Sequence, residues 1–458
     1  MLMDILGTLA AAVLTKECVV EQRLLEPLSN KQYISRELLP LPHEPMAQIT
    51  PVYQLDVQAT SEQFTTEQNQ IRNRVEAMET RVSEIEAQHF SPTAFLEGEV
   101  ILGFSGVSGR NIDDSVVFQE SVELTLNVSF TGEDALEVGL ESGNSREFLF
   151  VDELTFEGRL GFPSDTDGDS LRDSSASRFE LSELSYEFPI GDRSSLYIST
   201  TGDDLSDFNP FLGDNDDDDD DNSDGAISEF GSENPIHNLV EDIGLQLNYD
   251  LTDDLGISVG YFSAEASNPE PGAGLFNGNQ SAFVQLEFEP SDRFLLGFTY
   301  VHTYNDSSLE TETGSLRSQI NLERPVVGNS YGISTFFAPS PRFAIGGWVG
   351  LTKATVIDLG NADVWNYAFT LALPDFGKED NLLGVVIGQE PRLTGTSGFT
   401  IDDQRIDPDT SLHIELFYRN QLSDEISVTP GLVWITAPNH DNSNPDILVF
   451  TIRTTFKF

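Results

Sequence analysis

Acidic side chains are the residues of this sequence with the clearest capacity for chemistry. Between Arg193 and Arg293 the chain carries 23 Asp and Glu residues and no Lys or Arg. In a narrow passage, grouped carboxylates attract cations and repel anions. The densest run, residues 214–224, is typical of a solvated surface insert, because neighbouring like charges repel one another. The flanking carboxylates are better candidates for ordered positions in a constriction: Asp203, Asp204, Asp207, Glu229 and Glu233.

A second group of carboxylates has part of the spacing of a calcium loop. Asp165, Asp167, Asp169 and Asp173 would supply oxygen ligands at the first, third, fifth and ninth positions. The twelfth position, which normally carries a bidentate carboxylate, is Ala176. We therefore expect loosely bound calcium at most and no other cofactor, and a flexible acidic loop is the alternative.

Composition excludes several classes of protein. The 458 residues have a formal net charge of −53, which disfavours binding to nucleic acid. No apolar run reaches the roughly 20 residues of a membrane-spanning helix, and Cys18, as the single cysteine, rules out a disulfide framework. The six histidines are scattered, and the sequence has no phosphate loop or nucleophile elbow. We do not expect an enzyme.

From Phe95 onward, apolar and polar residues alternate with the period of a β-strand. Val122, Leu124 and Leu126 alternate with Glu123 and Thr125, and similar segments recur to the end of the chain. About 16 to 18 such segments occur, many of them about ten residues long, which suits strands that cross a membrane at a tilt. The charged residues on the polar face of these alternating segments are the candidates for lining a water-filled barrel: Glu97, Glu99, Glu123, Glu287, Glu289, Glu415, Arg419, Arg453 and Lys457.

The connections between these segments favour an outer-membrane barrel over a soluble sandwich. Short polar turns, such as the one at Asp253-Asp254, alternate with long loops, such as residues 390–410. The last strand pattern ends in Phe456 and Phe458, an ending typical of outer-membrane barrels and recognised by the barrel assembly machinery. We predict an all-β, antiparallel barrel of about 16 strands over residues 91–458.

The N-terminal 90 residues have a different pattern. Residues 1–54 are irregular and combine a degenerate signal-like apolar stretch with a proline-rich linker, and a truncated reading frame is the alternative. Residues 55–90 predict a short periplasmic helix or coiled coil, and one amphipathic helix packed on the barrel is the alternative. The apolar seam of this helix has a spacing of four and three residues: Ile71, Val75, Met78, Val82 and Ile85.

Several motifs resemble the cyanobacterial outer-membrane porins called iron uptake porins, within the wider carbohydrate-selective porin family. Similar stretches occur at residues 75–81, 209–212, 272–278 and 373–378, and the final 50 residues match best. The resemblance implies a homotrimeric porin in the outer membrane of a Gram-negative, cyanobacterial cell, in contact with lipid and lipopolysaccharide. Members of that family usually carry an S-layer homology domain, and residues 1–60 do not look like one.

These observations together predict passive diffusion of small hydrophilic solutes. The acidic excess favours inorganic ions, iron species included, with a modest cation preference. A carbohydrate-selective porin is the first alternative, and a structural barrel that anchors the envelope is the second.

Overall fold

A computed structural model describes residues 92–109, 115–144, 155–162, 179–201, 205, 208–212 and 225–458. The predictions for residues 1–90 therefore lie outside the described residues, as do the calcium-loop candidates Asp165 to Asp173. The same holds for three of the constriction candidates, Asp203, Asp204 and Asp207.

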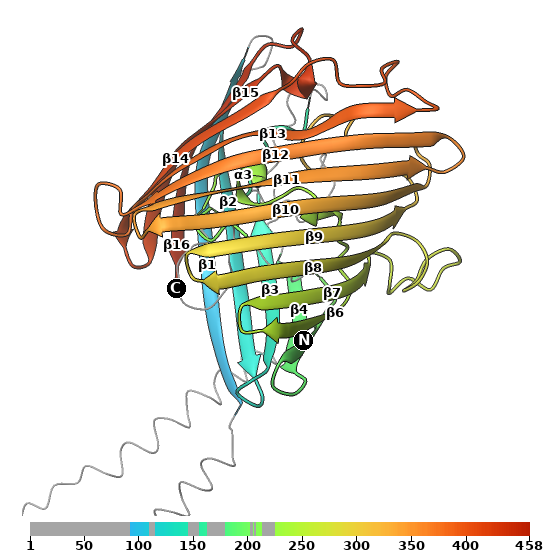
Figure 1. Ribbon diagram of the computed structural model, residues 1–458. Coiled ribbons are helices and arrows are strands. Elements are labelled where there is room, and N and C mark those ends of the chain that lie inside the picture. Colours follow the sequence, from blue (N-terminus) through green and yellow to red (C-terminus); the bar gives the residue numbers. More distant parts are fainter. Residues whose placement is uncertain are drawn as a thin grey trace, which may run out of the picture. The chain divides into compact units, whose positions relative to one another are not determined.

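The described part of the chain forms a closed antiparallel barrel of sixteen strands, in which each strand pairs with its neighbours in sequence and β1 pairs with β16 (Figure 1). The predicted fold class is confirmed. The strands are β1 (Thr93–Gly109), β2 (Ser115–Ser129), β3 (Ala135–Gly143), β4 (Glu180–Pro189), β5 (Ser194–Ser199), β6 (Gly244–Thr252), β7 (Leu255–Ser263), β8 (Gln280–Ser291), β9 (Phe294–Asn305), β10 (Val326–Ser340), β11 (Phe343–Val356), β12 (Gly360–Pro374), β13 (Leu382–Ser397), β14 (Leu412–Ser423), β15 (Ile426–Thr436) and β16 (Ile447–Lys457). The helical segments are α3 (Glu229–Ser232), η2 (His237–Leu239) and η3 (Pro438–His440). Within the described residues, no helix has the length and apolar character needed to cross a bilayer.

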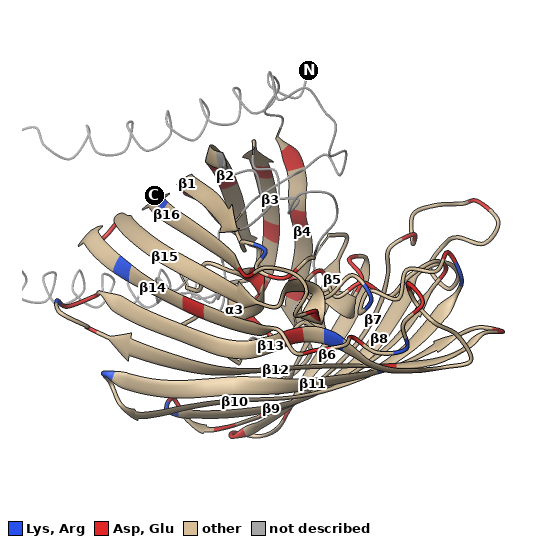
Figure 2. Cartoon of the chain, turned by 90° about the horizontal axis from the view of Figure 1, so that it is seen from above, with Lys and Arg blue, Asp and Glu red and all other residues tan. Residues whose placement is uncertain are grey.

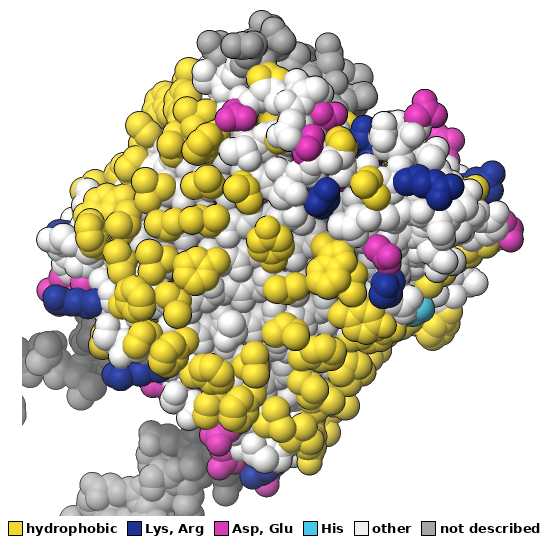
Figure 3. All heavy atoms as spheres, turned by 45° about the horizontal axis from the view of Figure 1, so that its top comes forward, with side chains coloured by type: hydrophobic (Ala, Val, Ile, Leu, Met, Phe, Trp, Pro, Cys, Tyr) yellow, Lys and Arg dark blue, Asp and Glu magenta, His cyan; other side chains and the backbone are white. Residues whose placement is uncertain are grey.

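The alternation of residue types separates the two faces of the wall. On β8, Phe283 and Gln285 point inward and are each 1% exposed, whereas Phe288 belongs to the outward set and is 39% exposed. Figure 3 shows one outer face, on which hydrophobic side chains cover the strands and charged side chains gather toward the margins. Such an apolar outer band is what a barrel needs in order to sit in lipid.

The two ends of the barrel differ, as the spacing of the turns predicts. The turn between β6 and β7 contains only Asp253 and Asp254, whereas residues 306–325 connect β9 to β10 at the other end. The first and last strands meet at the short-turn end, where Gly98 N donates to Phe458 O over 2.8 Å and Phe458 N donates to Gly98 O over 3.0 Å. Phe458 therefore belongs to the ladder that closes the barrel.

The hydrophobic core lies inside the ring of strands. We call residues 225–243 the constriction loop. This segment contains α3 and η2 and leads into β6, and Figures 1 and 2 show α3 within the barrel. Ile227, Phe230 and Ile236 of this loop are at most 1% exposed. Two inward-facing glycines allow the loop to approach the wall closely: an added Cβ would lie 2.5 Å from Ile227 at Gly431 and 2.8 Å from Phe230 at Gly388.

Candidate pore constriction

Four glutamates form a row across neighbouring strands of the inner wall. In the strand registers Glu99 lies opposite Glu123, Glu123 opposite Glu141, and Glu141 opposite Glu180. Residues that are directly opposite share one face of a sheet, and Figure 2 marks acidic residues along this part of the wall. Lys457 lies opposite Glu99 on its other side. Glu141 and Glu180 were missed by the sequence prediction, because only the register between strands aligns them with Glu99 and Glu123.

The constriction loop adds carboxylates opposite this row. A cavity of about 310 Å³ lies between the wall and the loop. Glu99, Glu123 and Glu141 line it from the wall, and Glu229 and Glu233 line it from the loop. Arg453 of β16 is the one cationic side chain among the lining residues that the structure describes. The cavity is therefore rich in carboxylates, and it brings together candidates from two distant parts of the sequence.

The backbone of α3 fixes the position of Glu229. The Ser228 hydroxyl caps the helix by accepting a hydrogen bond from Gly231 N over 3.0 Å. Asn238 Nδ2 donates to Glu229 Oε1 over 3.3 Å. Burial, reinforced by the neighbouring Glu233 carboxylate, raises the pKa of Glu229 to about 7. The charge of this side chain therefore changes near neutral pH.

Glu415 and Arg453 hold the loop by hydrogen bonds, and Arg453 also lines the acidic cavity. Ile227 N donates to Glu415 Oε1 over 2.7 Å, and the Ser228 hydroxyl donates to Glu415 Oε2. The Arg453 guanidinium donates to Gly225 O over 3.0 Å and to Ala226 O over 3.3 Å. Both side chains point inward, as the alternation predicts, but Glu415 is 0% exposed and Arg453 4%. The constriction loop covers Glu415 completely, so that Glu415 does not line water, whereas Arg453 is largely covered and still lines the acidic cavity.

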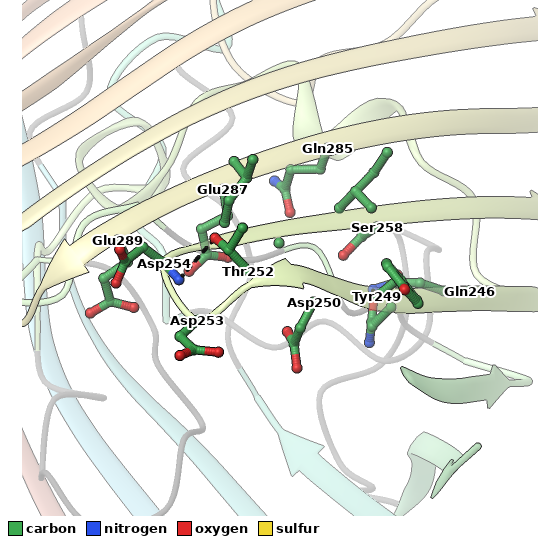
Figure 4. A pocket seen from close by; sticks show the side chains of 14 residues that line it. Gln246, Tyr249, Asp250, Thr252, Asp253, Asp254, Ser258, Gln285, Glu287 and Glu289 are labelled. Carbon is green, nitrogen blue, oxygen red and sulfur yellow. Dashed lines mark hydrogen bonds between the residues drawn. The ribbon is translucent and has the colours of Figure 1, made fainter. Parts of the chain in front are cut away.

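The remaining candidates on the wall have separate positions. Glu97 is exposed and accepts a hydrogen bond from Asn127 Nδ2 over 2.9 Å. Glu287 and Glu289 line a second cavity, of about 250 Å³, together with the acidic residues Asp250, Asp253 and Asp254 (Figure 4). Arg419 on β14 is half-buried. These candidates therefore do not form one group: Glu287 and Glu289 line the second cavity, whereas Glu97 and Arg419 line neither of the two cavities.

No group of three or more His, Cys, Asp or Glu side chains in the described part of the chain is arranged to hold a metal ion. The acidic cavities there offer distributed negative charge, without a closed ligand set of the kind a tightly bound metal needs.

Known proteins resemble this chain in sequence and in fold. A protein of Nostoc sp., described as uncharacterized, is 34% identical over 431 residues, which cover 88% of this chain and 72% of that protein. An uncharacterized protein of Synechocystis sp. is 29% identical over 427 residues, covering 87% of this chain and 75% of that protein.

Two solved structures show the same fold at low sequence identity. OprB of Pseudomonas putida aligns with a TM-score of 0.52 at 12% identity, covering 80% of this chain and 94% of that chain. The anion-selective porin from Comamonas acidovorans aligns with a TM-score of 0.50 at 9% identity, covering 80% of this chain and 100% of that one. Residues 55–458 match the family described as carbohydrate-selective porin, OprB family. This chain therefore belongs to the carbohydrate-selective porin (OprB) family and is a porin of the outer membrane.

Proposed function

We propose that this porin lets small hydrophilic solutes diffuse passively, and that it favours cationic and neutral polar solutes over anions. The observation that carries the proposal is the row of Glu99, Glu123 and Glu141 opposite Glu229 and Glu233 of the constriction loop. Carboxylates on both sides of a narrow passage produce a negative potential that concentrates cations and excludes anions.

The second acidic cavity supports the same preference. Asp250 of β6 and Glu287 and Glu289 of β8, two strands separated by β7, line it together with the amides of Gln246 and Gln285 (Figure 4). The fold alone does not set ion preference, since a structural neighbour is described as anion-selective. We therefore assign the preference to these side chains and not to the barrel.

Neutral sugars are the second solute class, and the family description favours them over iron. Six aromatic residues on the strands point inward, and all are at most 6% exposed: Tyr197, Phe262, Phe283, Phe336, Trp348 and Phe417. A sugar would therefore interact with carboxylate and amide groups, which accept hydrogen bonds from hydroxyls, rather than stack on these rings. Inorganic cations, iron species included, would be attracted by the same carboxylates, but no described side chain distinguishes iron from other cations.

We also propose that the porin is a homotrimer, which the resemblance to the cyanobacterial porins implies. Light scattering of the purified protein in detergent measures this directly. A mass of three chains is expected, and a mass of one chain would count against the proposal.

Liposome swelling with three solutes of similar size tests the proposed function. Glucosamine is cationic, glucose is neutral and gluconate is anionic, so that charge is the main variable. We expect swelling to be fastest for glucosamine, intermediate for glucose and slowest for gluconate. Equal rates for all three would show that the acidic residues do not act on solutes, and faster entry of gluconate would reverse the proposal.

A further inference from the structure

A buried histidine lies between two buried carboxylates behind the constriction loop. His413 Nδ1 lies 2.7 Å from Glu390 Oε1, and His413 Nε2 lies 3.3 Å from Glu415 Oε2. All three side chains are 0% exposed. A neutral imidazole has one N–H group, so only the doubly protonated ring donates to both carboxylates. The geometry therefore favours an imidazolium at His413.

Each carboxylate of this group holds a different segment inside the barrel. Glu415 accepts hydrogen bonds from Ile227 N and from the Ser228 hydroxyl of the constriction loop. Glu390 accepts one from Gly158 N over 2.9 Å. Glu390 also accepts one from Gly314 N over 3.1 Å and another from the Thr313 hydroxyl, both in the connection between β9 and β10. His413 therefore joins the anchor of the constriction loop to the anchor of two other segments.

The imidazolium of His413 is the main positive charge beside the carboxylates of Glu390 and Glu415, because the other side chains around them are neutral or directed elsewhere. Phe230 of α3 packs on the imidazole ring with 5.0 Å between ring centroids. Glu157 lies close to Glu390, and burial followed by repulsion from Glu390 raises the pKa of Glu157 to about 8, so that it holds its proton at neutral pH. Burial lowers the pKa of His440 to about 3, which keeps that ring neutral. Arg453 directs its guanidinium to the carbonyls of Gly225 and Ala226.

Removing one partner from a buried ionic group leaves an uncompensated charge, which is strongly unfavourable in a medium of low polarity. If His413 were neutral, Glu390 and Glu415 would repel each other across it, and relief would require movement of the segments that they hold. The constriction loop carries Glu229 and Glu233 into the passage, so that any such movement would alter the passage itself.

We propose that His413 is a positioning residue of the pore: by bridging Glu390 and Glu415 it locks the constriction loop in place and thereby sets the conductance and the charge of the passage. The inference deepens the proposed function and rests on it for the ion preference alone. Open-channel conductance and current noise report on the loop whichever ion the pore prefers, so that failure of the lock and failure of the proposed selectivity are distinguishable.

Single-channel recording of His413→Gln tests the proposal, with His302→Gln as the matched control. His302 is exposed on β9 and contacts Asn329 Oδ1 at 3.1 Å, away from the loop. We expect His413→Gln to raise the open-channel noise and conductance and to shift the reversal potential toward zero, while His302→Gln behaves as the wild type. Wild-type recordings from His413→Gln would overturn the proposal.

A second variant separates the bridging role from simple packing. If the defect of His413→Gln comes from two unbalanced carboxylates, then adding Glu415→Gln removes one charge and moves conductance and noise back toward wild type. Because Glu415 also anchors the loop, Glu415→Gln alone is recorded as the reference. A defect of the double variant that equals or exceeds the sum of the two single defects would show that His413 acts by packing, and would overturn the proposal. The double variant also carries the test if the single variant yields no folded barrel: recovery of folded protein supports the bridge, and continued failure contradicts it.

Discussion

Glu99 of β1 and Glu123 of β2 lie directly opposite each other across an antiparallel strand pair. Like charges in such positions destabilise a sheet, and the register extends the arrangement to Glu141 and Glu180. The row concentrates negative charge on one stretch of the inner wall. The negative potential at the constriction is the function that we assign to it.

Neutralising part of the row should change selectivity while leaving the barrel folded. We expect Glu99→Gln with Glu123→Gln to reduce the cation preference, because two carboxylates of the inner wall become neutral amides. Reversal potentials measure the selectivity, and the temperature at which the barrel unfolds, followed by its mobility in gel electrophoresis, measures the stability. Glu379→Gln, in the exposed turn after β12, is the control and should change neither. A loss of stability without a change in selectivity would contradict the assignment.

The pH dependence of selectivity should follow Glu229. Its pKa is raised to about 7 by burial and by Glu233, so the side chain is mostly neutral below that pH and mostly charged above it. Cation preference should therefore rise between about pH 6 and about pH 8. Reversal potentials recorded across this range check the expectation, and Glu229→Gln should flatten the curve. An equally steep curve in the variant would assign the titration to another group.

Substitution of Arg453 should loosen the constriction loop while preserving the local charge. The guanidinium reaches two carbonyls, Gly225 O and Ala226 O, and the single ammonium of Lys cannot reproduce its planar fork. A lost hydrogen bond to a charged group costs about 1.5–3 kcal/mol. We expect Arg453→Lys to increase current noise with little change in reversal potential. The control is Arg342→Lys, in the exposed turn after β10, which should have the current noise and reversal potential of the wild type. If Arg453→Lys also had wild-type current noise, other contacts would be sufficient to hold the loop.

Deletion of Phe458 should impair closure of the barrel. The deletion removes two ladder hydrogen bonds to Gly98, each worth about 0.5–1.5 kcal/mol. We expect a smaller folded fraction after refolding into detergent. Gel electrophoresis measures this fraction, because the folded barrel migrates differently from the heat-unfolded chain. Phe276→Ala, at an exposed loop residue, is the comparison and should fold normally. Normal folding of the deletion variant would show that the β1–β16 register does not need its last residue.

The sequence predicted the wall of the barrel well, because alternation is local. The alternation of Val284, Leu286 and Phe288 with Gln285 and Glu287 predicts that the apolar residues face outward and the polar ones inward, and β8 has that arrangement. Two-residue turns such as Asp253-Asp254 consist of residues that favour turns, so the sequence predicts where the flanking strands end.

The interior could not be predicted in the same way. The alternation places Glu415 and Arg453 on the inner face, but it does not reveal that residues 225–228 cover them. Loop segments without periodicity, such as residues 155–162, give no signal for the wall position that they contact. The alternation also does not reveal the contacts of His413, since its partner Glu390 lies on another strand.

The reversal potential of the wild-type porin in planar bilayers under a KCl gradient tests the central claim most directly. The account predicts a potential of the sign produced by potassium ions crossing faster than chloride, with a magnitude that falls as added salt screens the carboxylates. A potential near zero, or one of the opposite sign, would contradict the assignment of the acidic constriction as the selectivity element.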